Sequence, residues 1–173
     1  MAKIYILKTN ITDLDVDAIV NPANTSLLAG SGLCGVIHKA AGKELETECK
    51  QIGGCPTGQA VITRGYDLNA AYVIHAVGPH YYRDGENAHQ LLENCYLNIM
   101  KTANINMLKS IAIPAISTGV YRYPHRDAAN ITLKKICDFI THENEHVMDI
   151  VFAVPTEDNF QIYNELYAQY FTS

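Results

Sequence analysis

Two loops in this sequence combine glycine with hydroxyl or amide side chains, groups that can hold a phosphate without help from a cation. The first loop follows the apolar run 17–21 and contains Gly30, Gly32 and Gly35 just before a helical pattern begins. Glycine leaves backbone N–H groups exposed, and a helix that begins beside them adds the positive end of its dipole. The loop therefore predicts an anion site, although a tight turn that packs a helix on a strand would explain the glycines equally well. It lacks the Gly-Lys-Ser/Thr ending of a Walker A loop.

The second loop follows the apolar run 110–115 and extends from Ser117 to Pro124. Its serine, threonine and glycine offer hydroxyl and N–H donors, while Tyr121 and Tyr123 offer flat aromatic faces. The alternative interpretation is a polar turn that leads into a helix opened by Pro124. Two such loops after strands of one small protein favour a clamp around a phosphate ester.

Short apolar runs and helical stripes alternate along the chain and predict the framework that positions these loops. Several runs have no polar face, which is typical of strands in a sheet covered on both sides. The predicted strands are 3–8, 17–21, 60–65, 72–77, 110–115 and 149–154, and the predicted helices include 87–103, 125–141 and 158–171. This alternation predicts an α/β fold, a three-layer α/β/α sandwich with a central mixed sheet. A ligand of such a sheet binds beyond the carboxyl ends of the strands.

Composition argues against several classes of protein. A chain of 173 residues with 48% hydrophobic composition fits one domain, residues 1–173, with a sizeable core. The formal net charge of −5 argues against general nucleic-acid binding, which needs clustered lysine and arginine. The five cysteines form no CxxC pair, so we expect reduced thiols rather than disulfides or a zinc site. Neither a signal pattern nor a bilayer-length apolar stretch is present, and we expect a cytoplasmic monomer with no membrane partner.

Four ordered segments resemble the macrodomain family, whose members bind ADP-ribose. The segments are VNPANTSLLAGSGLCGVIHKAAG, GCPTGQAVITRGYDL, YVIHAVGP and IPAISTGVYRYP, and the similarity extends from about Ile4 to the C-terminus. The chain is most similar to the MacroD-type branch, whose members remove ADP-ribose from acidic side chains and deacetylate O-acetyl-ADP-ribose. The resemblance implies a metal-independent hydrolase with no cofactor, whose ligand is ADP-ribose or an ADP-ribosylated protein.

The resemblance also implies roles for individual residues. Asn10 and Ile11 would bind adenine, and Asn24 and Tyr121 would lie at the distal ribose. The backbone of the two loops would wrap the diphosphate. The implied ligand-binding residues are Asn10, Ile11, Asn21, Asn24, Gly30, Ser31, Gly32, Leu33, Cys34, Ser117, Thr118, Gly119, Val120, Tyr121 and Arg122, and the implied catalytic residues are Asn24, Cys34 and Tyr121.

Four positions depart from the family pattern. Asn10 replaces an aspartate that accepts a hydrogen bond from adenine, and Pro155 stands where many relatives have an aromatic residue that stacks on adenine. Each change would weaken adenine binding by about 1 kcal/mol. Arg122 replaces a glycine, so it is either a cation beside the diphosphate or a solvated side chain, and a left-handed backbone there would have to rearrange. The fourth is Cys34, where MacroD-type hydrolases have an acidic proton acceptor.

Cys34 leaves catalysis open, because a thiol is a poor replacement for a carboxylate as a proton acceptor. Cys34 and His38 would suit a nucleophile–base pair, but spacing alone does not make one, and a small residue lining the cleft is the favoured interpretation. The leading hypothesis is hydrolysis by a water that the phosphate and Asn24 position. The alternatives are an ADP-ribose reader with little or no catalysis, and a module for another nucleotide or a nucleic-acid end. The remaining candidates are interpreted as structural: Arg64, His75, Cys95 and Cys137.

Overall fold

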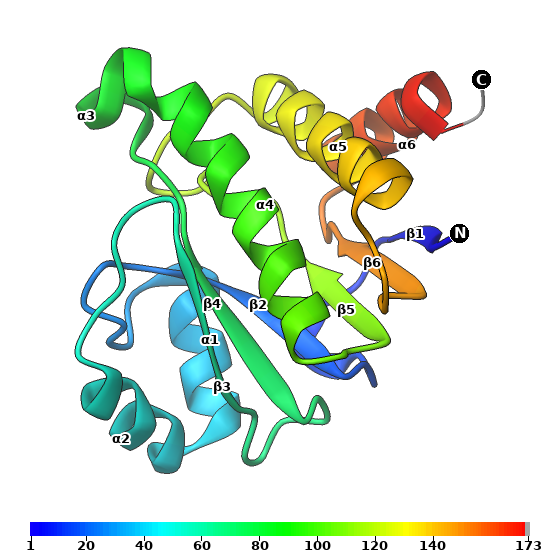
Figure 1. Ribbon diagram of the computed structural model, residues 1–173. Coiled ribbons are helices and arrows are strands. Elements are labelled where there is room, and N and C mark those ends of the chain that lie inside the picture. Colours follow the sequence, from blue (N-terminus) through cyan, green and yellow to red (C-terminus); the bar gives the residue numbers. More distant parts are fainter. Residues whose placement is uncertain (172–173) are drawn as a thin grey trace.

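One mixed sheet of six strands forms the middle layer of the computed structural model, which describes residues 1–171 (Figure 1). The strands are β1 (Lys3–Leu7), β2 (Ala18–Ala23), β3 (Ala60–Arg64), β4 (Tyr72–Val77), β5 (Ser110–Ile113) and β6 (Asp149–Ala153). Their order is β1-β6-β5-β2-β4-β3, and every neighbouring pair is parallel except β3 and β4. All six predicted strands are therefore confirmed, and β2 extends two residues beyond its predicted end.

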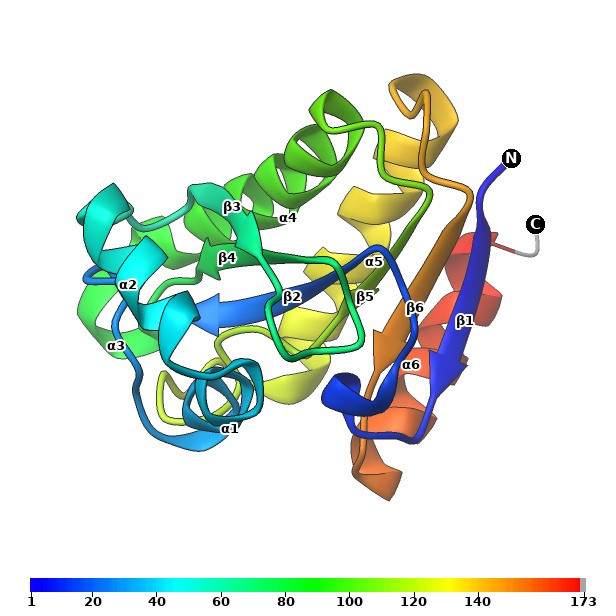
Figure 2. The same cartoon turned by 90° about the horizontal axis from the view of Figure 1, so that it is seen from below.

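Helices cover both faces of the sheet, which confirms the predicted three-layer α/β/α sandwich (Figures 1 and 2). The helices on one face are α1 (Gly32–Ala41) and α2 (Lys43–Ile52), and those on the other are α4 (Ala88–Ile105), α5 (His125–His142) and α6 (Glu157–Phe171). Short turns of helix complete the chain: η1 (Ile11–Asp13), α3 (Tyr81–Asp84) and η2 (Gly85–Asn87). The three helices expected from their apolar stripes are α4, α5 and α6.

Alternate residues of the central strands pack against the helices on opposite faces of the sheet. Val20 of β2 and Ile74 of β4 point toward α4 and α5, while Ile19 and Val73 pack with Ile37 of α1. All five side chains are essentially inaccessible to solvent. Because both faces of these strands are buried, neither face has the row of polar side chains that a solvated face would have. The runs are therefore almost continuously apolar.

The second helix of the chain, α2, has no apolar stripe that would reveal it in the sequence. Its sequence KELETECKQI is mostly charged, and only Leu45 and Cys49, one turn apart, are buried. Two apolar positions do not make a stripe that stands out from a solvated segment. At the β1 edge of the sheet, Tyr5 and Leu7 are about two-fifths exposed.

The described residues contain no helix that is both long and apolar enough to cross a membrane. All five cysteines are free thiols. Cys95 is buried on α4, as expected, while Cys137 on α5 is half-buried and donates to the carbonyl of Tyr170.

Candidate functional site

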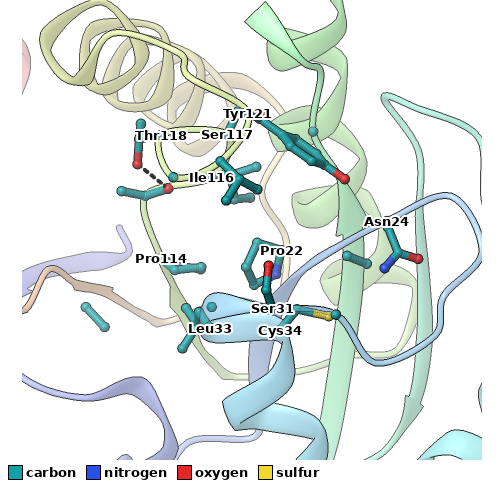
Figure 3. Close-up of a pocket in the computed structure, with 18 of the residues that line it drawn as sticks. Pro22, Asn24, Ser31, Leu33, Cys34, Pro114, Ile116, Ser117, Thr118 and Tyr121 are labelled. Carbon is teal, nitrogen blue, oxygen red and sulfur yellow. Dashed lines mark hydrogen bonds between the residues drawn. The ribbon is translucent and has the colours of Figure 1, made fainter.

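The carboxyl ends of β2, β4, β5 and β6 border a cavity of about 470 Å³ (Figure 3). The cavity is lined by Pro22, Ala23, Asn24, Gly30, Ser31, Gly32, Leu33, Cys34, Gly78, Pro114, Ala115, Ile116, Ser117, Thr118, Gly119, Val120, Tyr121, Ala153 and Pro155. Both predicted loops contribute to this lining, on the predicted edge of the sheet. No lining residue carries a formal charge at neutral pH, so an anion bound here would be held by dipoles and hydrogen bonds.

Helix α1 points its N-terminus at the cavity. Ser31 is the N-cap residue and makes no side-chain capping bond, so the first N–H groups of α1 keep their donor capacity. Gly32, Leu33 and Cys34, which carry those N–H groups, all line the cavity. The preceding loop packs closely on the helix, because a β-carbon at Gly35 would overlap the carbonyl of Gly30. The glycines therefore allow the tight turn and also leave backbone N–H groups exposed to the cavity, so the two interpretations of this loop are compatible.

The second loop faces α1 across the cavity and is held by three internal hydrogen bonds. Thr118 Oγ1 donates to the carbonyl of Ala115 at 2.8 Å, as Figure 3 shows. The N–H of Tyr123 donates to the carbonyl of Ser117 at 2.8 Å, and the N–H of Arg122 to the carbonyl of Gly119 at 3.0 Å. In the described part of the chain, no protein group accepts a hydrogen bond from the N–H of the lining residues 119–121. These donors remain available to a ligand.

Asn24 is oriented by its own loop. Its Nδ2 donates to the carbonyl of Leu28 at 3.0 Å, and its Oδ1 accepts a 2.6 Å hydrogen bond from Ser26 Oγ. One N–H and one lone pair of the amide remain for another partner. In Figure 3, Asn24 and Tyr121 lie toward the same end of the cavity, opposite Leu33 and Pro114.

Cys34 lies on the cavity wall between two polar partners. Its Sγ accepts from Asn21 Nδ2 at 3.7 Å and donates to the carbonyl of Leu28 at 3.8 Å. Among the described residues, no hydrogen bond joins Cys34 to His38. Burial lowers the pKa of His38, against a smaller opposing effect of Glu46. This geometry favours a small lining residue over a nucleophile–base pair.

Comparison with known proteins identifies the family. The Macro domain model matches residues 20–132, a span that includes both loops. The chain belongs to the macrodomain family. A protein of Escherichia fergusonii named O-acetyl-ADP-ribose deacetylase is 49% identical over 175 residues, which cover 97% of each chain. The ADP-ribose glycohydrolase MACROD2 of Xenopus laevis is 45% identical, and the match covers 98% of this chain but only 41% of that longer protein. Among solved structures, the macrodomain of Oceanobacillus iheyensis with ADP superposes with a TM-score of 0.90 at 37% identity, covering 95% of this chain and 89% of that one.

Four of the residues implied by the resemblance do not line the cavity of this macrodomain. Asn10 is the exposed N-cap of η1, and Ile11 is buried in the core beneath it. Asn21 is fully buried, and Arg122 is exposed beside Tyr121. Asn10 nevertheless follows β1, the neighbour of β6, so it lies beyond the same sheet edge as Pro155, which does line the cavity.

Arg122 keeps the conformation that favours glycine. Its φ is +66°, so the expected rearrangement of a left-handed backbone does not occur. The arginine instead carries the strain of a left-handed residue, about 1–2 kcal/mol. Ser117, at φ +68°, is strained in the same way, and its buried hydroxyl has no hydrogen-bond partner among the described residues. Backbone strain and an unpaired polar group are both characteristic of functional sites.

A buried group of potential metal ligands lies behind the cavity wall. The ligand atoms of His38, Cys49 and His75 lie within 4.8 Å of one another. Both ring nitrogens of His75 are already hydrogen bonded, to Asn21 Nδ2 at 3.0 Å and to Thr63 Oγ1 at 2.9 Å. Burial lowers the pKa of His75 to about 3. The ring is therefore a neutral, satisfied core residue, which agrees with the structural role predicted for it.

Sequence reasoning missed the lining residues that come from the strand ends themselves, such as Pro22, Gly78 and Ala153. They are small or apolar and carry no chemistry of their own. The sequence feature that could mark them is a place directly after an apolar run, which holds for Pro22 after 17–21 and for Gly78 after 72–77, while Ala153 lies within 149–154.

Proposed function

We propose that this macrodomain binds ADP-ribose and hydrolyses ADP-ribosyl esters, namely mono-ADP-ribose on acidic side chains, O-acetyl-ADP-ribose, or both. The observation that carries the proposal is the arrangement of donors around an uncharged cavity. The uncapped N-terminus of α1 lies on one side and the unused N–H groups of 119–121 lie on the other. A diphosphate fits between them, because helix N-termini and clustered N–H groups bind phosphate without a cation.

The reaction needs a water positioned at the distal ribose. In the proposed step, the oxygen of that water bonds to the anomeric carbon, the bond from this carbon to the carboxylate oxygen breaks, and the carboxylate leaves with its electron pair. The ligand's own phosphate accepts the proton of the water, and the free N–H of Asn24 orients the reacting groups. In an O-acetyl ester the water oxygen bonds to the acyl carbon instead, the bond from this carbon to the ribose oxygen breaks, and the ribose oxygen leaves as a hydroxyl by taking the proton that the phosphate received from the water. The rate enhancement comes from orientation and from fixed N–H dipoles around the cavity.

The comparisons support this choice of reaction. The relative that covers 97% of this chain carries the name of a deacetylase of O-acetyl-ADP-ribose, and a second relative is named a glycohydrolase of ADP-ribose. A mutant of the Oceanobacillus iheyensis macrodomain, which superposes on this chain with a TM-score of 0.92, was solved with ADPR. The match covers only 41% of the glycohydrolase, so the proposal for this chain draws on the matched region alone.

We also propose that the reaction requires no metal and no cofactor. Cys34 is the one lining residue of a type that commonly binds metals, and a single thiol does not form a site for a divalent ion. Turnover should therefore be unchanged after dialysis against EDTA. A loss of turnover that added zinc or magnesium reverses would overturn this part of the proposal.

A reader module with little or no turnover is the second candidate, and Cys34 is the observation that favours it. The thiol donates a hydrogen bond to the carbonyl of Leu28 and accepts one from Asn21, and a protonated thiol is a poorer proton acceptor than a carboxylate. Calorimetric binding of ADP-ribose without ester cleavage over a long incubation would decide for the reader.

Substitution of Asn24 tests the hydrolase mechanism. Asn24→Ala should reduce release of ADP-ribose from a modified acidic substrate by about tenfold or more. Ser26→Ala, which keeps the amide but removes the hydroxyl that orients it, should lose about threefold to tenfold, the value of one hydrogen bond. Equal rates for wild type and Asn24→Ala would refute the mechanism.

We further propose a monomer that acts in the cytoplasm. Five free thiols suit a reducing compartment, and the net charge of −5 disfavours nucleic acid as a general partner. Light scattering at working concentration and fractionation of cells that express the tagged protein test the two parts.

A further inference from the structure

His80 is tied to the second loop although it does not line the cavity. It follows β4 and begins the short helix α3. Its N–H donates to Asp84 Oδ2 at 2.8 Å, and its carbonyl accepts from the N–H of Asp84 at 2.9 Å. The next residue, Tyr81, donates its N–H to the carbonyl of Tyr121 at 2.8 Å. The turn at 80–84 is therefore a rigid unit fastened to the backbone of Tyr121.

The ring of His80 lies flat on the ring of Tyr121. The ring centroids are 3.5 Å apart and the planes are inclined by 27°, which places the two faces in van der Waals contact. A second aromatic contact supports the same turn, because Tyr81 meets the buried ring of Tyr123 edge-on at 4.9 Å. Tyr121, which lines the cavity, thus has one face covered by His80.

Few atoms pack against the tip of the second loop. Val120 is 72% exposed, and a β-carbon placed on Gly119 would have no neighbouring atom within 4 Å. Arg122 is strained and exposed. Tyr121 therefore lies in an exposed stretch of the loop, and the stack on His80 is the one aromatic contact of its ring among the described residues.

We propose that His80 is a positioning residue that holds the ring of Tyr121 at the distal-ribose end of the cavity. The inference rests on the proposed function, since it assigns that end of the cavity to the ribose. His80 acts through its flat surface rather than its charge. Burial and the neighbouring Arg83 lower its pKa, with Asp84 opposing them, so the ring that faces Tyr121 stays neutral at neutral pH.

Three variants test the proposal. His80→Ala removes the stack, and His80→Phe keeps a flat ring without a titratable group. His89→Ala is the control, since His89 on α4 is an exposed histidine that stacks on no ring among the described residues. Binding of ADP-ribose and of ADP is measured by calorimetry, and ester cleavage by steady-state kinetics. ADP lacks the distal ribose and so reports on the rest of the cavity.

His80→Ala should weaken ADP-ribose binding about fivefold to tenfold, the value of an aromatic pair, and should weaken ADP binding by less than about twofold. The ratio kcat/KM should fall in parallel with ADP-ribose affinity. His80→Phe should recover most of the loss, and His89→Ala should match wild type. A variant that only loses thermal stability would bind ADP and ADP-ribose more weakly by the same factor. The ratio of the two affinities therefore distinguishes a positioning role from a folding defect.

Two results overturn the role of His80. One is wild-type affinity and kcat/KM in His80→Ala, and the other is an equal loss for ADP and ADP-ribose that His80→Phe does not recover. If the wild-type protein itself binds no ADP-ribose, the proposed function falls, and this inference falls with it. If the wild type binds and cleaves its substrate but the variants do not differ from it, the role of His80 is refuted and the proposed function stands.

Discussion

Gly78 and Ser117 meet on the wall of the cavity with no room for a further atom between them. A β-carbon at position 78 would overlap the hydroxyl of Ser117 and press on the side chain of Ile116. The end of β4 and the start of the second loop are therefore fitted to each other through a missing side chain, and the loop's position depends on that fit.

Gly78→Ala should displace the second loop. We expect a loss of about 1–3 kcal/mol in the free energy of unfolding, as in other overpacked sites, and a loss of about tenfold or more in ADP-ribose affinity. Gly119→Ala is the control for stability alone, because a β-carbon there meets open space and its φ is not in the left-handed region. Denaturant titration measures the stability, and calorimetry measures the binding. Equal stability of the two variants would contradict the close fit.

Arg122→Gly should stabilise the protein, since glycine adopts a φ of +66° without a clash. Relief of about 1–2 kcal/mol of strain is partly offset by the greater freedom of glycine in the unfolded chain, which leaves about 0.5–1 kcal/mol. A rise of about 1–4 °C in Tm is expected for a chain of this size. Arg122→Ala removes the cation but keeps the strain, so it should not raise Tm. If Arg122→Ala and Arg122→Gly both weaken ADP-ribose binding, the guanidinium contacts the ligand.

Cys34→Asp should raise turnover by about tenfold or more, because a carboxylate restores a general base at the position where the family has an acid. Asn21 Nδ2, which now donates to the thiol, can donate to the carboxylate instead. Cys34→Ser keeps a small donor and should leave turnover unchanged. Abolished turnover in Cys34→Ser would show that the thiol itself takes part.

Acid should destabilise the fold through His75. Burial, aided by the nearby His38, lowers its folded pKa to about 3, while an unfolded histidine titrates near 6.5. The stabilisation is fully present above pH 6.5 and is lost as the pH falls toward 3, because the unfolded chain gains a proton that the folded one does not. Between pH 7 and 5 the free energy of unfolding should fall by about 1–2 kcal/mol. Denaturant titrations at the two pH values measure the change, and equal values would contradict the neutral, buried ring.

The strands were predictable because each is an apolar run bounded by turn residues, and burial on both faces of β2 and β4 gives no competing pattern. The position of the site followed from the same regularity, since the two glycine-containing loops come directly after β2 and β5. Helix α2 was not predictable, because its fold depends on two buried side chains, Leu45 and Cys49, in an otherwise charged segment.

The role of His80 lies beyond the reach of sequence patterns for a different reason. His80 and Tyr121 are far apart in the chain, and neither spacing nor composition relates them. Their rings meet only because β4 and β5 flank β2 in the sheet and send their following loops to one edge. The positive φ of Arg122 was suggested only by the glycine that the family has at this position, because arginine itself does not favour that conformation.

The uncharged lining of the cavity also has a consequence for the speed of binding. The chain carries a net charge of −5, and no charged side chain lines the cavity to attract an incoming diphosphate from a distance. The ligand therefore approaches against a long-range repulsion, which salt screens over a Debye length of about 10 Å at 0.1 M. Association should become faster as ionic strength rises, opposite to proteins that draw in phosphates with lysine and arginine. Dissociation, which breaks only short contacts to N–H groups, should hardly respond to salt.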